Sequence, residues 1–141
     1  MIVVVDAGVA VKWYVEEEHT REAELLLDKR FEIHAPDLLL PEFGNVLWKK
    51  CRSDDLDENT ARGAIGSIGD RGIFFHSSSK LLNSAFTGAL ETGQSYYDWT
   101  YLALAIALEC NLVTADRRFF IALRNTRFKK YAVWIEHIET L

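Results

Sequence analysis

Four acidic residues fall where a predicted strand ends or a predicted helix begins, namely Asp6, Glu42, Asp98 and Asp116. Asp6 directly follows one apolar, β-branched run, and Asp116 closely follows a second. In open parallel sheets, ligands bind beyond the carboxyl ends of the strands. We therefore expect the four carboxylates to converge at one edge of a sheet. Taken singly, Asp6 and Asp116 are each better explained as a helix N-cap, which stabilises a fold without doing chemistry.

Converging carboxylates predict a bound divalent cation. Like charges at short range raise one another's pKa and destabilise a fold unless a cation compensates them. Carboxylates are hard oxygen donors, and the sequence places no set of His or Cys beside them, which favours Mg²⁺ or Mn²⁺ and disfavours zinc. Such an ion can activate water and offset charge on an attacked phosphate. The pattern therefore predicts phosphodiester hydrolysis.

The charge of the chain is unevenly distributed. The net charge is −5, but residues 117–130 contain six cations and no acid, whereas residues 1–116 contain ten cations and nineteen acids. Phosphate binding requires Lys and Arg. We expect Arg117, Arg118 and Arg124 to contact the backbone of a nucleic acid. An equally weighted alternative pairs these arginines with surface acids.

The elements that must position these residues alternate between strands and helices. Apolar and β-branched runs predict strands over residues 2–5, 31–35, 73–75, 112–113 and 131–135. Helical spacing predicts helices over residues 9–15, 16–30, 41–52, 77–90, 95–110 and 117–124. This alternation predicts an α/β fold in which helices cover a parallel sheet.

Three local features refine this prediction. Asp37 is placed to cap the helix that Pro41 enters, and the helix over residues 95–110 is apolar nearly all round, which indicates burial. Glycines recur every third residue over a polar stretch, at Gly63, Gly66, Gly69 and Gly72. We expect that stretch to be a mobile or partner-contacting clip, since glycines let another backbone approach closely.

Length and composition bound the remaining possibilities. A chain of 141 residues with 49% hydrophobic residues predicts one folded domain over residues 1–141. No apolar run approaches the ~20 residues that cross a bilayer, and no signal-peptide pattern precedes the first strand. We expect a cytoplasmic protein without a membrane segment. Cys51 and Cys110 stand outside any metal-ligand spacing and are assigned no chemistry.

Four stretches resemble, in order, the motifs of the PIN-domain family and most of all its VapC-type toxins: VVDA at 4–7, PEFGNVL at 41–47, YDWTYLALA at 97–105 and LVTAD at 112–116. The resemblance spans nearly the whole chain. It implies a three-layer α/β/α sandwich with a central, mostly parallel sheet of four to five strands. One departure is Gly8, where the family commonly has Ser, so a hydroxyl near the site is missing.

The resemblance also implies an activity and partners. It implies a ribonuclease that depends on Mg²⁺ or Mn²⁺, acts as the toxin of a type II toxin–antitoxin system, is neutralised by a cognate antitoxin and is often a homodimer. The acidic quartet of the family matches Asp6, Glu42, Asp98 and Asp116, and supporting polar positions match Asn45 and Thr114. On this basis Asp6, Asp98 and Asp116 would anchor the ion, and Glu42 would complete its shell through water or hold a second ion.

Two other functions compete with this one. A PIN-like module could bind RNA or a protein without cutting, which predicts RNA retention that does not depend on metal. A small-molecule phosphohydrolase of another α/β family is the weaker alternative, because the sequence around Asp6 lacks a second Asp two residues later.

Overall fold

The computed structural model describes all residues from Met1 to Leu141. Its five strands form one sheet in the order β3-β2-β1-β4-β5, and every neighbouring pair is parallel. The strands are β1 Ile2–Val5, β2 Glu32–Pro36, β3 Phe74–His76, β4 Asn111–Thr114 and β5 Ala132–Trp134. The predicted α/β class with a central parallel sheet is confirmed, and each predicted strand lies within one or two residues of an observed one.

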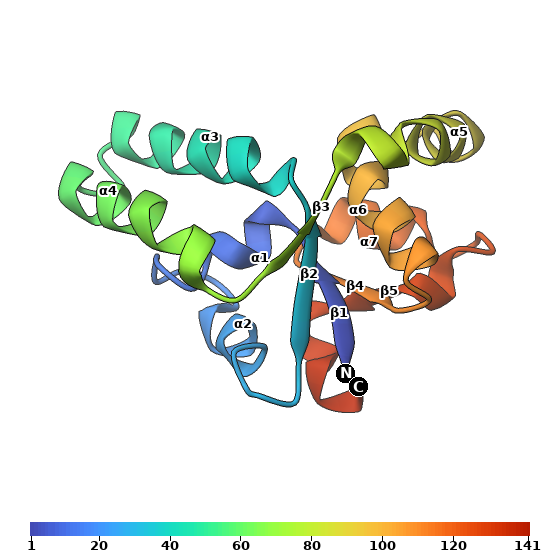
Figure 1. The fold of residues 1–141 in the computed structure, drawn as a ribbon, viewed down its shortest axis with the longest axis horizontal. Coiled ribbons are helices and arrows are strands. Elements are labelled where there is room, and N and C mark those ends of the chain that lie inside the picture. Colours follow the sequence, from blue (N-terminus) through green and yellow to red (C-terminus); the bar gives the residue numbers. More distant parts are fainter.

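Helices cover both sides of this sheet (Figure 1). The α-helices are α1 Ala7–Val11, α2 Thr20–Leu25, α3 Leu39–Arg52, α4 Glu58–Ser67, α5 Leu82–Thr92, α6 Tyr96–Ala107 and α7 Arg117–Ala122. Short 3₁₀ turns occupy Ile68–Asp70, Ser78–Leu81, Lys129–Tyr131 and Ile135–Thr140. In Figure 1, α1 to α4 lie on one side of the sheet and α5 and α6 on the other. None of the helices combines the length and apolar character that a bilayer crossing needs.

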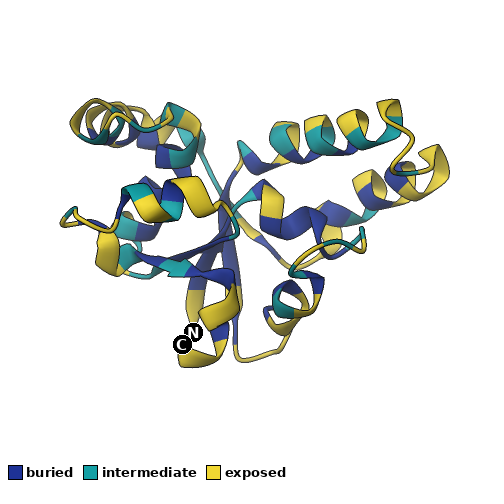
Figure 2. Cartoon of the chain, turned by 180° about the vertical axis from the view of Figure 1, so that it is seen from behind, coloured by how far each residue is buried: buried dark blue, intermediate teal, exposed yellow.

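The core lies where the sheet meets its inner helices (Figure 2). Strand β1 is central, and Val3, Val4 and Val5 are almost fully buried because both faces of the strand are covered. Helix α6 is buried over most of its length and packs against β1, β2 and β4, which confirms its predicted burial. The outer faces of the remaining helices stay exposed, as the alternation of colours in Figure 2 shows.

The helix predicted over residues 16–30 is wrong in extent, because α2 spans only Thr20–Leu25. The Thr20 hydroxyl donates to the Val15 carbonyl and accepts from the Glu17 amide, which fixes a turn instead of a first helical turn. His19 then enters α2 with a positive φ of 66°. Side chain–backbone hydrogen bonds of this kind compete with helix formation at short range.

The predicted cap at Asp37 is also wrong. Helix α3 begins after Leu38 without a side-chain cap. The Asp37 carboxylate instead accepts hydrogen bonds from the amide and hydroxyl of Ser78. The reason is sheet pairing, because β2 and β3 run side by side and the Asp37 amide donates to the His76 carbonyl at 2.8 Å.

Candidate active site

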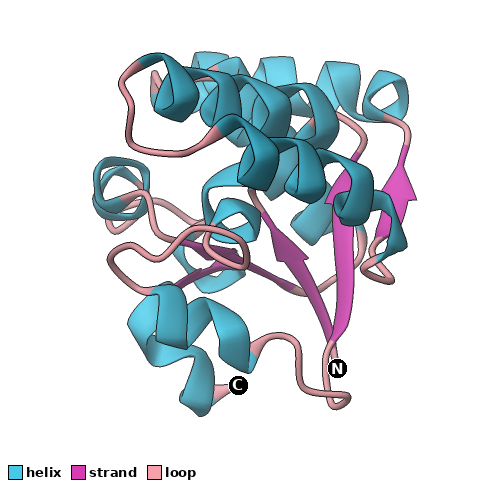
Figure 3. Cartoon of the chain, turned by 90° about the vertical axis from the view of Figure 1, so that its left-hand side faces the viewer, coloured by secondary structure: helices cyan, strands magenta, loops and turns pink.

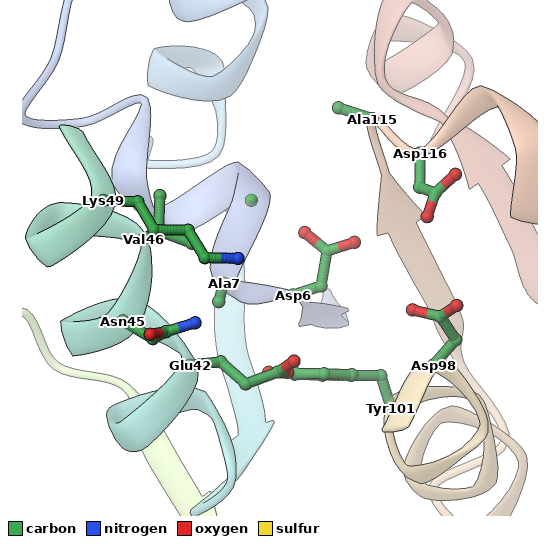
Figure 4. Close-up of a pocket in the computed structure, with 11 residues that line it drawn as sticks. Asp6, Ala7, Glu42, Asn45, Val46, Lys49, Asp98, Tyr101, Ala115 and Asp116 are labelled. Carbon is green, nitrogen blue, oxygen red and sulfur yellow. The ribbon is translucent and has the colours of Figure 1, made fainter. Parts of the chain in front are cut away.

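The four predicted acids line one open pocket of about 380 Å³ (Figure 4). The strands run toward the end of the molecule where the helices gather (Figure 3), and the pocket lies beyond their carboxyl ends. Loops after β1 and β4 carry Asp6 and Asp116, while α3 carries Glu42 and the first turn of α6 carries Asp98. The predicted convergence at one edge of the sheet is therefore seen in the structure. The remaining lining residues are Ala7, Gly8, Asn45, Val46, Lys49, Tyr101 and Ala115.

Asp6 combines a capping role with a place in the pocket. Its Oδ1 accepts from the Val9 amide at 2.9 Å and caps α1, and its Oδ2 accepts from the Thr114 hydroxyl at 2.9 Å. The pKa of Asp6 is raised to about 6, mainly by burial and to a smaller extent by the charges of Asp116 and Glu42, while the hydrogen bonds from Val9 and Thr114 act in the opposite direction. Asp6 therefore caps α1 and also lines the pocket.

Thr114 links the two strand-end acids. Its side chain is fully buried, and its hydroxyl donates to Asp6 while accepting from the Asp116 amide at 3.0 Å. Asp116 in turn caps α7 by accepting from the Phe119 amide at 3.0 Å. The Thr114 hydroxyl thus connects the loop after β1 to the loop after β4. Thr114 is one of the two positions that the family resemblance indicated as supporting polar residues.

Asp98 has a pKa well above the ordinary value of an aspartate. It is half-buried, and burial together with the charges of Asp116, Asp6 and Glu42 raises its pKa to about 7. Figure 4 shows the Asp98 and Asp116 carboxylates next to each other on the side of the pocket opposite α3. Without a cation, this acid is therefore partly protonated at neutral pH.

Glu42 is held by a residue that sequence reasoning placed only in the core. The buried Tyr101 donates its hydroxyl to Glu42 Oε1 at 2.5 Å, which connects α6 to α3 across the pocket. Burial and the Glu42 charge raise the pKa of Tyr101, so it remains a protonated donor. The available signal was its spacing, because Tyr101 stands three residues after Asp98 and so shares its helix face.

The donor set suits a hard cation that keeps part of its water. The pocket offers only carboxylate, amide and hydroxyl oxygens beside one ammonium group. No three acidic, His or Cys side chains approach closely enough to make a ready-made ligand cluster. Mg²⁺ commonly binds through one or two carboxylates and retains several waters. Burial is the main cause of the raised pKa of Asp6 and of Asp98, and the charges of the neighbouring acids, which raise both pKa values further, are charges that a bound cation would offset.

The three predicted RNA-contacting arginines do not line this pocket. Arg117 lies over the Trp134 ring at 5.2 Å, and together with Arg124 it lines a separate hollow that also contains Glu136 and His137. Arg118 is exposed on α7. Of the other supporting residues, Asn45 does line the acidic pocket. Lys49 lies there too, and sequence reasoning missed it.

Comparison with known proteins supplies independent information. A family model described as "PIN domain" matches residues 3–125. The protein named "Ribonuclease VapC3" from Pyrobaculum aerophilum is 35% identical over 120 residues, which are 84% of this chain and 92% of that protein. "Ribonuclease VapC1" from Mycobacterium tuberculosis is 34% identical over 93 residues, 63% of this chain and 66% of that protein.

Solved structures agree on the fold. A crystal structure of a Pyrobaculum aerophilum protein superposes with a TM-score of 0.73 at 22% identity, covering 99% of this chain and 88% of that one. The VapBC2 structure from Rickettsia felis, bound to a DNA fragment from its promoter, gives a TM-score of 0.64 at 15% identity over 95% of this chain and 98% of that one. At these identities the likeness concerns the fold alone.

Proposed function

Because this chain belongs to the PIN-domain family, we propose that it is an Mg²⁺- or Mn²⁺-dependent ribonuclease and the toxin of a type II toxin–antitoxin system. The observation that supports this most strongly is the set of four acids on one open pocket at the carboxyl edge of the sheet. Its relatives named as VapC ribonucleases point in the same direction. The proposed substrate is RNA, cleaved at a phosphodiester bond.

The pocket residues divide the work of binding and positioning. Asp6, Asp98 and Asp116 would hold the ion directly or through water, and Glu42 would reach it through water. When bound, the ion lowers the pKa of a water and offsets charge on the attacked phosphate. Thr114 keeps Asp6 and the Asp116 loop in register.

Two side-chain features prepare the pocket for a cation. Tyr101 occupies Glu42 Oε1, which leaves Oε2 for the pocket. Asp98 would give up its proton near neutral pH once a cation occupied the pocket, because a cation would offset the charges of Asp116, Asp6 and Glu42 that help to raise its pKa.

The decisive measurement is cleavage of RNA by the purified protein with Mn²⁺, with Mn²⁺ plus chelator, and with the Asp98→Asn variant. We expect cleavage only in the first reaction, with the variant reduced by at least about 100-fold, because the change removes one ligand and its charge. Equal cleavage in all three reactions would defeat the proposal. RNA retention without cleavage and without metal would instead support a binding module.

The proposed partners follow from the same family membership. We propose a cognate antitoxin protein, whose co-expression should relieve growth arrest caused by this chain alone. We also propose that residues 1–141 act as one domain in the cytoplasm, and that Arg117, Arg118 and Arg124 guide RNA outside the acidic pocket. A homodimer is proposed through α5, which exposes Leu82, Phe86 and Leu90 on one face.

A further inference from the structure

Lys49 is the only cationic side chain that lines the acidic pocket. It stands on α3 with Glu42 and Asn45, at positions i, i+3 and i+7, so the three side chains share one helix face. Figure 4 shows its ammonium group extending from α3 toward Asp6. The α3 wall of the pocket therefore presents a positive charge opposite the carboxylates of α6 and β4.

The neighbouring lysines have other partners. Lys50 of α3 forms an ion pair with Glu17 Oε2 at 2.8 Å, and Lys12, which follows α1, forms one with Glu17 Oε1 at 3.0 Å. Glu17 thereby connects the end of α1 to α3. Lys49 forms none of the ion pairs in the structure, although four acids line the same pocket. Lys49 is an exposed residue, and its ammonium group is therefore available to a ligand.

The other candidates for phosphate binding point elsewhere. Arg117 is turned onto the Trp134 ring, and Arg127 pairs with Glu91 at 3.1 Å. A phosphodiester has two non-bridging oxygens that share its negative charge, so a side-chain cation can contact one of them while an ion held by the acids contacts the other. Among the side chains that line the pocket, only Lys49 supplies such a cation.

We propose that Lys49 is a substrate-binding residue that donates to a non-bridging phosphate oxygen of RNA seated at the acidic pocket. This inference rests on the proposed ribonuclease function and names the protein group that receives its substrate. An ammonium group acts as a point charge on phosphate and carries no base specificity. The contact therefore positions the backbone of any RNA sequence that enters the pocket.

The test measures binding of a labelled single-stranded RNA pool of mixed sequence, with the full chain made non-cleaving by Asp98→Asn. Into this background we place Lys49→Ala, Lys49→Arg and the matched control Lys50→Ala, which removes the same charge from the next residue. We expect Lys49→Ala to weaken binding about 5- to 10-fold at moderate salt. We also expect it to reduce the slope of log K against log salt by about 0.7, the value for one phosphate contact on a single strand.

The two other variants complete the pattern. Lys49→Arg should restore most of the affinity, and Lys50→Ala should stay within about twofold with an unchanged salt slope. An unchanged slope for Lys49→Ala, with only its melting temperature or metal affinity altered, would overturn the inference, since Lys49 would then merely neutralise the acids. If the Asp98→Asn background with Lys49 intact fails to retain RNA, the inference is overturned as well. RNA cleavage by the unmodified protein tests the proposed ribonuclease function separately, so a failure of the Lys49 inference can be distinguished from a failure of that function.

Discussion

At the scale of single residues, the acidic pocket joins stability and function in the same side chains. Asp6 and Asp116 each cap a helix and each face the pocket. The backbone at Gly8 has room for the side chain of the Ser that the family commonly has at this position. A Cβ built there would lie 3.4 Å from Asp6 Oδ1, which is an ordinary contact distance. Burial disfavours the charged form of Asp6 and is the main reason that its pKa is raised to about 6.

We therefore predict that Asp6→Asn stabilises the metal-free protein while abolishing cleavage. An Asn keeps the cap and removes a buried charge, which should add about 3 kcal/mol to the free energy of unfolding at pH 7.5. Its amide nitrogen cannot accept from Thr114, and the loss of that hydrogen bond should reduce the gain to about 2 kcal/mol. The folded pKa of Asp6 lies above its unfolded value, so the folded protein binds more protons and loses stability as the pH rises through about 6.

The advantage of the variant should accordingly shrink on acidification and disappear below pH 4, where Asp6 is protonated in both folded and unfolded chains. Denaturant melts in chelator across this pH range measure the difference. A variant that is less stable than the parent at pH 7.5 would show that the Asp6 charge is not the source of strain.

At the scale of elements, the placement of Asp98 depends on how α5 and α6 pack. Gly88 of α5 lies against the indole of Trp99, and a Cβ there would come within 2.2 Å of the ring. Trp99 is nearly fully buried and its Nε1 donates to the Thr92 hydroxyl at 2.7 Å, so the ring has little freedom to move. The glycines of α4 differ, because a Cβ at Gly63 would meet nothing within 4 Å.

These two glycines therefore predict opposite outcomes for the same substitution. Gly88→Ala should destabilise the fold by about 1 to 3 kcal/mol through overpacking, and it should lower cleavage because Trp99 adjoins Asp98. Gly63→Ala should stabilise α4 by up to about 1 kcal/mol, since the helix interior gains propensity at no steric cost. Thermal melts of both variants measure the contrast. A stabilised Gly88→Ala would refute the close packing of α5 on α6.

At the scale of the whole molecule, the free faces of the glycine-spaced stretch and of α5 leave room for other chains. A Cβ built on Gly63, Gly66 or Gly69 would meet nothing within 4 Å, so no other element of this chain packs on that side of the glycines, and the predicted clip for a partner stays a prediction. On α5, Leu82, Phe86 and Leu90 are 56%, 58% and 70% exposed at intervals of four residues. Regular apolar exposure of this extent is typical of a protein contact surface.

We predict that this face of α5 makes the homodimer. Phe86→Asp should convert a dimer into a monomer, because a dimer interface would bury the new charge without a partner. Sedimentation velocity of both proteins at matched concentration measures the change, and Leu25→Asp, on an exposed site of α2, serves as the charge control. A dimer that persists in Phe86→Asp would place the contact elsewhere.

The sequence by itself determined the alternation of strands and helices, the burial of the middle of the helix predicted over residues 95–110, and which four acids to examine. These follow from periodicity and from what immediately precedes or follows each residue, which are local properties. Only the tertiary structure decided that Tyr101 holds Glu42, that Asp37 binds Ser78, and that His34 and His76 share a hydrogen bond at 2.8 Å across β2 and β3. It also turned Arg117 away from the acids and left Lys49 among them. The physical reason is that these contacts join residues far apart in the chain, so strand order, register and the crossing of helices set their partners.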